Sequence, residues 1–332
     1  MKTLLPILLL VGALGFVGAY HELYGPRRTP EAPPQALTVP PGASVASVAE
    51  TLHSMGLVRH PMMFRLWVMA RGDAAHLKAG EYSLEGPLSV DQIVDMLVQG
   101  QVSRHDVTVP EGKSLRDAAA IVAARGIDGK AFLAAAADPS LVRDLDPNAK
   151  DLEGYLFPDT YDIPPQRSAA DLVTRMAQRF REVITPELPR VAQCGLTLRE
   201  VVTLASIVEL ETARGEERPR IAAVFLNRLK KRMPLQTDPT VIYAMRAAGI
   251  YDGNIRKKDL GIYSPYNTYK YPGLPPGPIA SPGREALLAV LDPAPVQDLY
   301  FVSRNDGTHQ FSATLAEHAR AVDRYQRRRG GS

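Results

Sequence analysis

Two glutamates, Glu209 and Glu211, lie in a stretch of sequence that otherwise indicates a buried helix. Thr197, with Glu200 three residues later, fits a capping box at the start of that helix. A carboxyl group in apolar surroundings has a raised pKa, which suits a general acid that must hold a proton near neutral pH. Apolar residues lie all around the helix, as in helices of a protein core: Leu198, Val201, Val202, Leu204, Ala205, Ile207 and Val208.

The two carboxylates point to nearly opposite sides of the helix, because two residues of helix rotate by about 200°. Only one of them can therefore line a given cleft. The alternative is structural: both glutamates lie at the fraying end of the helix and pair in solvent with Arg214, Arg218 or Arg220. The helix by itself favours this alternative, since structural ion pairs are commoner than catalytic acids.

A second amphipathic helix and three rigid loops follow the two glutamates. The pattern predicts this helix over residues 219–231, with Asn227 and Arg228 off its apolar face. The loops are rich in proline, glycine and polar residues, which fix the backbone and supply hydroxyl and amide groups. They indicate a groove that is shaped before a ligand binds. The three segments cover residues 235–240, 264–269 and 273–283.

The whole chain has the composition of an ordinary globular protein, with 332 residues, 45% of them hydrophobic and 23% charged. Its length allows two or three domains. A net charge of +3, without a basic patch interleaved with aromatic residues, argues against nucleic acid as a partner. The single Cys194 excludes an intrachain disulfide. His309 and His318 lack metal-ligand spacing and are expected to be surface or loop histidines, so no metal or other cofactor is predicted.

Residues 1–20 contain an apolar run, residues 4–20, that predicts a membrane-targeting segment. We expect an uncleaved single-pass anchor with the rest of the chain outside the cytoplasm, and a cleaved signal peptide is the alternative. Arg27 and Arg28 are unfavourable for this orientation, because positive residues prefer the cytoplasmic side. Residues 21–36 are predicted to form a stiff, proline-rich linker.

An internal repeat with an offset of 70 residues follows the linker. Residues 38–45 align with residues 108–115, and each copy predicts a strand, a Pro-x-Gly turn, a serine cap and a helix. The first copy continues into a further strand and helix, so residues 37–105 resemble LysM, a glycan-binding α+β domain. A generic α+β spacer explains the pattern equally well. Residues 106–165 are predicted to form a second α+β module and a connection.

The predicted fold class is α+β, with a transmembrane helix first, LysM-like modules next and a mainly helical α+β domain last. That last domain covers residues 166–326 and contains the two glutamates, and residues 327–332 form a basic tail. Just before it, residues 152–161 are rich in aromatic and turn-forming residues. Such a cluster can bind sugars by stacking, but it is more often part of a core.

Seven segments, in their order along the chain, resemble the YceG-like family of endolytic murein (peptidoglycan) transglycosylases. The resemblance covers nearly the whole chain, to about Tyr325. One departure lies within the glutamate motif, at Leu210, where the family commonly has a lysine; both glutamates are present. The segments are residues 153–161, 205–212, 224–229, 235–243, 266–269, 273–279 and 300–302.

The resemblance implies a periplasmic enzyme on the inner (cytoplasmic) membrane that cuts β-1,4 bonds between N-acetylmuramic acid and N-acetylglucosamine in nascent glycan strands. Glu211 matches the family's catalytic carboxylate, which leaves Glu209 as a structural or supporting partner. Beyond the glycan strands, peptidoglycan synthases and division or elongation proteins are the partners to expect. By extrapolation from the matched motifs, substrate binding is assigned to Asn227, Gln236, Asp238, Tyr266, Asn267 and Tyr269.

In the implied mechanism, protonated Glu211 gives its proton to the departing glycosidic oxygen. The carboxylate then takes the proton of the muramoyl 6-hydroxyl, which attacks C1 and leaves a 1,6-anhydro end, so that strand length is limited. One carboxylate is enough, whereas ordinary glycosidases need two. Two alternatives stay open: a hydrolytic muramidase that uses Glu211 with Asp238 or Glu209, and a non-catalytic wall-binding scaffold.

Overall fold

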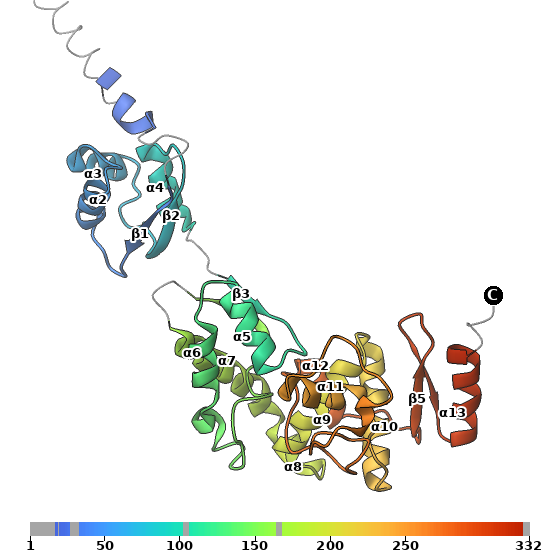
Figure 1. Cartoon of the computed structure of the whole chain (residues 1–332). Helices are drawn as coiled ribbons and strands as arrows, with labels where there is room; N and C mark the ends of the chain where they lie inside the picture. Colours follow the sequence, from blue (N-terminus) through green and yellow to red (C-terminus); the bar gives the residue numbers. More distant parts are fainter. Residues whose placement is uncertain (1–16, 19, 27–32, 102–105, 164–167, 328–332) are drawn as a thin grey trace, which may run out of the picture. The chain divides into compact units, whose positions relative to one another are not determined.

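The computed structural model of the chain divides into two compact units, residues 1–105 and 106–332 (Figure 1). Both units combine helices with small two-stranded antiparallel sheets, and helices predominate, which confirms the mixed α+β prediction. Each unit has a hydrophobic core of its own, so each is described by itself. The structure describes residues 17–18, 20–26, 33–101, 106–163 and 168–327.

The first unit packs α2, α3 and α4 with a two-stranded sheet around one core. Strands β1 and β2 are antiparallel, with Leu37 opposite Tyr82 and both side chains fully buried. Ser44 accepts a hydrogen bond from the backbone N–H of Ser47 and caps α2, as the repeat predicts. The elements are β1 (Gln35–Val39), α2 (Val45–Ser54), α3 (Pro61–Ala70), β2 (Gly80–Leu84) and α4 (Val90–Gln99).

A short helical segment precedes the first strand and belongs to the same unit. Residues 20–24 are helical, and Leu23 is buried in the core of the unit. The predicted anchor, residues 1–20, lies largely outside the described residues. Within the described residues, no single helix is long and apolar enough to span a bilayer. Two consecutive segments, Ala169–Gln193 and Leu198–Glu211, are together long and apolar enough, but a bend of 108° separates them.

The second unit opens with the other copy of the repeat. Strand β3 pairs antiparallel with β4, with Thr108 opposite Thr160, and Ser114 forms a capping box at the start of α5. This pairing brings the start of the unit beside the aromatic segment, in which Tyr155 and Leu156 are buried in the core. The elements are β3 (Asp106–Val109), α5 (Leu115–Ala123), α6 (Gly129–Ala136), η1 (Pro139–Val142), β4 (Asp159–Asp162) and α7 (Ala169–Ile184).

Helix α9 is the central helix of the second unit and packs against α10, α11 and α12. Its residues 201–208 are buried on all sides, and the capping box of Thr197 and Glu200 is present, which confirms the predicted core helix. The remaining elements are η2 (Thr185–Glu187), α8 (Leu188–Gln193), α9 (Leu198–Glu211), η3 (Gly215–Glu217), α10 (Arg218–Lys230), α11 (Asp238–Ala247), η4 (Asp259–Gly261), α12 (Arg284–Leu291), β5 (Tyr300–Ser303), β6 (His309–Ser312), α13 (Leu315–Val322) and the π-helical η5 (Asp323–Arg327).

The proline-rich loop before α12 is fixed against α9 and against the repeat. The backbone N–H of Ile279 donates to Oγ of Ser206 in α9 at 3.1 Å. The backbone of Ser281 forms two hydrogen bonds of 2.9 Å, accepting from Gly112 and donating to Lys113 in the turn of the repeat. The loop is thus held from two sides.

Candidate active site

Glu211 is the last residue of α9, and its side chain is partly buried. Thr212 ends the helix because its backbone is extended, with φ of −146° and ψ of 138°. A negative charge at the C-terminal end of a helix is unfavourable, since the last backbone carbonyls carry partial negative charge. The hydroxyl of Thr237 offsets this effect by donating a hydrogen bond to Oε1 of Glu211.

The surroundings raise the pKa of Glu211 to about 7. Burial is the largest cause, because it disfavours the ionised form. The hydrogen bond from Thr237 acts in the opposite direction and lowers the pKa. Among the nearby charges, Asp238 raises the pKa, and His309 and Arg228 lower it. Near neutral pH this carboxyl group can therefore both give and take a proton, as a general acid and base must.

Buried threonines hold Thr237 in place beside Glu211. The backbone N–H of Thr237 donates to Oγ1 of Thr268 at 3.2 Å, and the hydroxyls of Thr240 and Thr268 lie 2.9 Å apart. Gln236 has a left-handed backbone, with φ of 52°, and its N–H donates to the carbonyl of Thr268 at 3.2 Å. These bonds fix the loop before α11 and hence the direction of the Thr237 hydroxyl.

Three of the six predicted binding residues lie around this pair. Gln236 and Asp238 flank Thr237 in the chain, and both are exposed. The hydroxyl of Tyr269 donates to Oδ1 of Asp238 at 2.6 Å. Burial raises the pKa of this Tyr269 hydroxyl above its usual range, and the carboxylates of Asp238 and Glu211 raise it further. The Tyr269 hydroxyl is therefore a neutral hydrogen-bond donor, and Asp238 is its acceptor.

The other three predicted binding residues face neighbouring parts of the fold. Asn267 is fully buried, and its amide donates to two carbonyls of the preceding loop at 3.0 and 2.9 Å. The amide of Asn227 donates to two carbonyls before β5 at 2.9 and 3.1 Å. The ring of Tyr266 packs on Tyr243, with 4.8 Å between centroids. The hydroxyl of Tyr243 in turn donates a hydrogen bond to the carboxyl group of Glu153. The side-chain contacts of these three residues are structural.

Glu209 lies on the other side of α9, as the helical rotation predicts. Its Oε1 accepts a hydrogen bond from Arg218 at 2.8 Å, and its Oε2 accepts one from the backbone N–H of Gly283 at 2.9 Å. The side chain is only 6% exposed, and Arg218 also pairs with Glu285 at 2.6 Å. Glu209 is therefore an ion-paired carboxylate that joins α9, α10 and the start of α12.

His309 and Glu217 form a pair beside the candidate acid, Glu211. The sequence does not reveal this pair. Both the backbone N–H of His309, at 2.9 Å, and its ring Nδ1, at 2.6 Å, hydrogen-bond to the carboxylate of Glu217. Oε2 of Glu217 also accepts from the hydroxyl of Thr212, the residue after Glu211, at 3.5 Å. The expectation of a surface or loop histidine is wrong for His309, which lies in β6 with a largely buried side chain. The pair joins partners 92 residues apart, so no local spacing could reveal it.

A second carboxyl group with a raised pKa, Glu153, lies away from Glu211. Burial raises the pKa of Glu153 to about 8, although the carboxyl group accepts hydrogen bonds from the backbone N–H of Leu115 at 3.0 Å and from Tyr243 at 3.2 Å. It borders a cavity of about 290 Å³ between α5 and α11, which Asp117 and Arg246 also line. A raised pKa alone therefore does not single out the reacting carboxylate.

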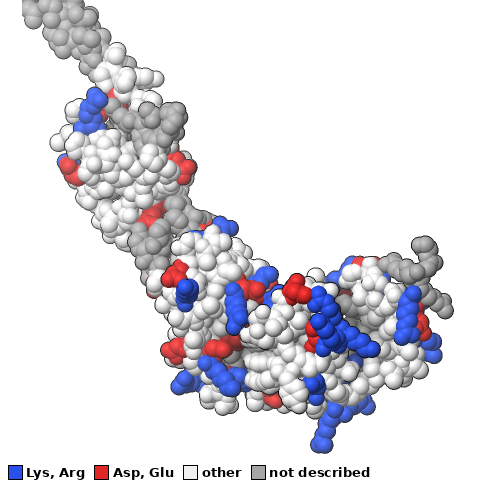
Figure 2. Space-filling view, in the orientation of Figure 1, with Lys and Arg blue, Asp and Glu red and all other residues white. Residues whose placement is uncertain are grey.

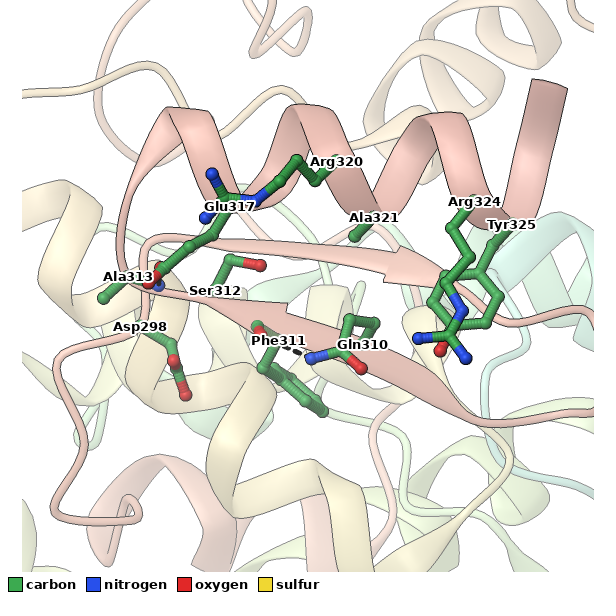
Figure 3. A pocket seen from close by; sticks show the side chains of 10 residues that line it. All are labelled: Asp298, Gln310, Phe311, Ser312, Ala313, Glu317, Arg320, Ala321, Arg324 and Tyr325. Carbon is green, nitrogen blue, oxygen red and sulfur yellow. Dashed lines mark hydrogen bonds between the residues drawn. The ribbon is translucent and has the colours of Figure 1, made fainter. Parts of the chain in front are cut away.

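A larger cavity, of about 640 Å³, lies between the β5–β6 hairpin and α13. Figure 3 shows Glu317 and Arg320 on the helix above the strands, with Arg324 and Tyr325 at the far end. Neither Glu211 nor any predicted binding residue lines it. The lining residues are Asp298, Gln310, Phe311, Ser312, Ala313, Glu317, Arg320, Ala321, Arg324 and Tyr325.

The described part of the chain has no group of three or more His, Cys, Asp or Glu side chains that could hold a metal ion. On the face shown in Figure 2, Lys and Arg side chains are interspersed with Asp and Glu. Because its pKa is raised to about 7, Glu211 can take part in proton transfer, with Thr237, Asp238, Tyr269 and the Glu217–His309 pair around it.

Comparison with known proteins gives consistent matches over most of the chain. The model of the YceG-like family matches residues 37–324. An endolytic murein transglycosylase of Bacillus subtilis (strain 168) is 35% identical over 306 residues, which are 87% of this chain and 84% of that protein. One of Streptococcus pneumoniae serotype 2 is 32% identical over 86% of this chain, but the match spans only 57% of that protein. The crystal structure of a YceG-like protein from Listeria monocytogenes superposes with a TM-score of 0.60 at 32% identity, covering 86% of this chain and 98% of that one.

Proposed function

This chain belongs to the YceG-like family, and from that premise we propose that it is an endolytic peptidoglycan lytic transglycosylase. Its substrate is the β-1,4 bond between N-acetylmuramic acid and N-acetylglucosamine within nascent glycan strands. The observation that carries this proposal is the Glu211 carboxyl group, whose pKa is raised to about 7 and whose orientation Thr237 fixes. The names of the relatives from Bacillus subtilis and Streptococcus pneumoniae support the same reaction class.

The reaction proceeds in two proton transfers at Glu211. The protonated carboxyl group donates to the glycosidic oxygen as the C1–O bond breaks, and the carboxylate then accepts the proton of the muramoyl 6-hydroxyl. That oxygen attacks C1 and closes a 1,6-anhydro ring, so no water is consumed. Positive charge that develops at C1 is stabilised by the acetamido group of the substrate or by Asp238, which the hydroxyl of Tyr269 holds at 2.6 Å.

Removal of the acid tests this assignment. We expect Glu211→Gln to abolish cleavage of purified glycan strands while the thermal unfolding midpoint stays near that of the wild type. Glu216→Gln is the matched control, because Glu216 lies five residues away and its side chain is 75% exposed. Full activity of Glu211→Gln would overturn the assignment.

Mass spectrometry of the new sugar ends separates the reaction types. Anhydro ends are lighter by one water than the reducing ends that a hydrolytic muramidase leaves. The proximity of Asp238 to Glu211 is the observation in favour of such a muramidase, since Asp238 would be its second carboxylate. A scaffold without catalytic activity would leave no new ends at all.

The apolar run in the sequence supports a proposal for the location of the protein in the cell. We propose that residues 4–20 anchor the chain in the inner membrane, with the second unit in the periplasm, and that the LysM-like first unit contacts glycan. Peptidoglycan synthases and division or elongation proteins are the proposed protein partners. Cell fractionation with and without residues 1–20 tests the anchor.

A further inference from the structure

Helix α3 of the first unit presents apolar side chains on both of its sides. Phe64 and Val68 point into the core and are fully buried. Met62, Leu66 and Met69 are exposed by 58%, 53% and 65%. Their spacing of four and three residues places them on one face of the helix. The α3 face consists of these three side chains, Met62, Leu66 and Met69, and the exposed Arg65. A row of three large exposed apolar side chains is uncommon on a soluble surface and indicates an interaction site.

The α3 face adjoins the segment through which the chain would leave a membrane. The rings of Tyr24 and Trp67 meet edge to face with 5.9 Å between centroids, and Tyr20 lies 5.0 Å from Tyr24. Leu23 is packed into the core of the first unit. The helical residues 20–24, which begin at the last residue of the apolar run, are therefore in contact with α3. Tyrosine and tryptophan are enriched where proteins meet lipid headgroups.

The segment that forms α3 has only positive side chains of its own, although Asp91 of α4 accepts a hydrogen bond from the indole N–H of Trp67 at 2.8 Å and Asp73 pairs with Arg71. Residues 54–72 contain Arg59, Arg65 and Arg71 and no Asp or Glu. Arg71 is bound by Asp91 and Asp95 of α4, whereas Arg59 and Arg65 are exposed. Exposed cations beside apolar side chains suit anionic phospholipids, since the stems lie along the acyl boundary and the guanidinium groups reach the phosphates.

We propose that the α3 face docks on the bilayer surface and holds the first unit against anionic phospholipids, rather than at a distance from the membrane. The inference rests on the proposed anchor and goes beyond the proposed reaction. Met62, Leu66 and Met69 enter the headgroup and acyl boundary, Arg65 binds phosphate, and Tyr20, Tyr24 and Trp67 lie at headgroup depth. A two-fold contact with a second copy would instead place Arg65 of both copies on the same patch.

The single tryptophan of the chain, Trp67, reports on this docking. The full chain is reconstituted in vesicles of phosphatidylcholine and phosphatidylglycerol whose acyl chains carry bromine, which quenches tryptophan fluorescence at short range. We expect strong quenching of the wild type. The variant with Met62→Gln, Leu66→Gln and Met69→Gln should lose at least about half of it, because its α3 face no longer favours the acyl boundary. Vesicles without phosphatidylglycerol should also quench less.

The matched control changes three exposed apolar residues of the second unit, with Leu133→Gln, Ile250→Gln and Leu315→Gln. It should be quenched like the wild type. Circular dichroism melting checks that both triple variants are folded. Equal quenching of the wild type and the α3-face variant would overturn the proposal, because the anchor alone would then bring Trp67 to the lipid. Cross-linked dimers that the α3-face variant abolishes, with weak quenching of the wild type, would also overturn it.

Two further measurements separate this inference from the proposals on which it rests. Sedimentation with the vesicles tests the anchor, and a wild-type chain that stays in the supernatant would overturn both the anchor and the docking. Release of anhydro ends from soluble glycan strands tests the reaction independently of lipid. Loss of quenching in the α3-face variant, with sedimentation and anhydro ends unchanged, is the result that the proposal requires.

Discussion

The hydroxyl of Thr237, at the start of α11, donates a hydrogen bond to the carboxylate of Glu211, at the end of α9. The two residues are 26 positions apart, and the backbone N–H of Thr237 is itself held by Thr268 at 3.2 Å. The loop that contains Thr237 is thus held by hydrogen bonds, and its Thr237 hydroxyl orients the Glu211 carboxylate. Burial raises the pKa of Glu211 and this bond lowers it, so the bond limits how far the pKa rises.

Thr237→Val removes the hydrogen bond and keeps the shape of the side chain. Because the bond favours the ionised form, its loss raises the pKa of Glu211 further above 7. The alkaline limb of the activity profile, which reports loss of the acid proton, should therefore move to higher pH. Loss of one hydrogen bond worth about 1 kcal/mol should lower activity at the optimum roughly fivefold. Thr237→Ser is the control and should keep the wild-type profile, and an unmoved limb in Thr237→Val would contradict the prediction.

Asp238→Asn should move the same limb in the opposite direction. The Asp238 carboxylate raises the pKa of Glu211, so its neutralisation lowers that pKa and shifts the alkaline limb to lower pH. The asparagine oxygen can still accept the hydrogen bond from Tyr269, which keeps the local geometry. The measurement is kcat/KM against pH on purified glycan strands. A shift to higher pH would show that Asp238 does not act on Glu211 through its charge.

Glu153 should make the stability of the second unit depend on pH. Burial raises its pKa in the folded state to about 8 from an ordinary value of 4.5, so the folded state holds the proton more tightly than the unfolded state. Stability from this group is fully present below about pH 4.5 and is lost as pH rises to about 8. In Glu153→Gln, the decrease in the free energy of unfolding over this pH range should be smaller by roughly 2 to 4 kcal/mol. Denaturant unfolding at pH 5 and pH 8 measures it, with exposed Glu216→Gln as a control that keeps the wild-type difference. An unchanged difference in Glu153→Gln would contradict the assignment.

Gly154→Ala should destabilise the second unit strongly. Gly154 has φ of +82°, and a β-carbon there would lie 2.4 Å from Cβ of Pro278 and 3.0 Å from Cγ1 of Val202. Gly126 is the matched control, with φ of +81° and open space around its missing side chain. Backbone strain of about 1 kcal/mol applies to both sites, whereas overpacking of about 1 to 3 kcal/mol applies only at Gly154. Thermal midpoints should therefore fall about 5 °C further for Gly154→Ala than for Gly126→Ala. Equal midpoints would show that Pro278 can move aside.

Local patterns in the sequence predict several elements correctly. Helix α10 covers Arg218–Lys230, close to the predicted residues 219–231, and Ser44 and Ser114 cap the helices of both copies of the repeat. Helix α9 is buried all around, and its geometry separates Glu209 from Glu211. These features depend on neighbours within a few residues, so periodicity, caps and rotation per residue are enough to derive them.

Contacts between side chains far apart in the chain could not be predicted from the sequence. Arg214, Arg218 and Arg220 are all plausible partners of Glu209 by spacing, and only packing selects Arg218. Asn227 and Asn267 look like polar ligand groups, yet the fold uses their amides to hold loops.

By itself, the sequence determined the helices, the repeat and the motif that carries the two glutamates, because short-range backbone preferences and side-chain period are written residue by residue. Only the tertiary structure decided that Thr237 meets Glu211, that Glu217 binds His309 and that Glu153 is buried beside Tyr243. Hydrogen bonds and desolvation depend on which distant segments the core brings together, and that is a property of the packed chain as a whole.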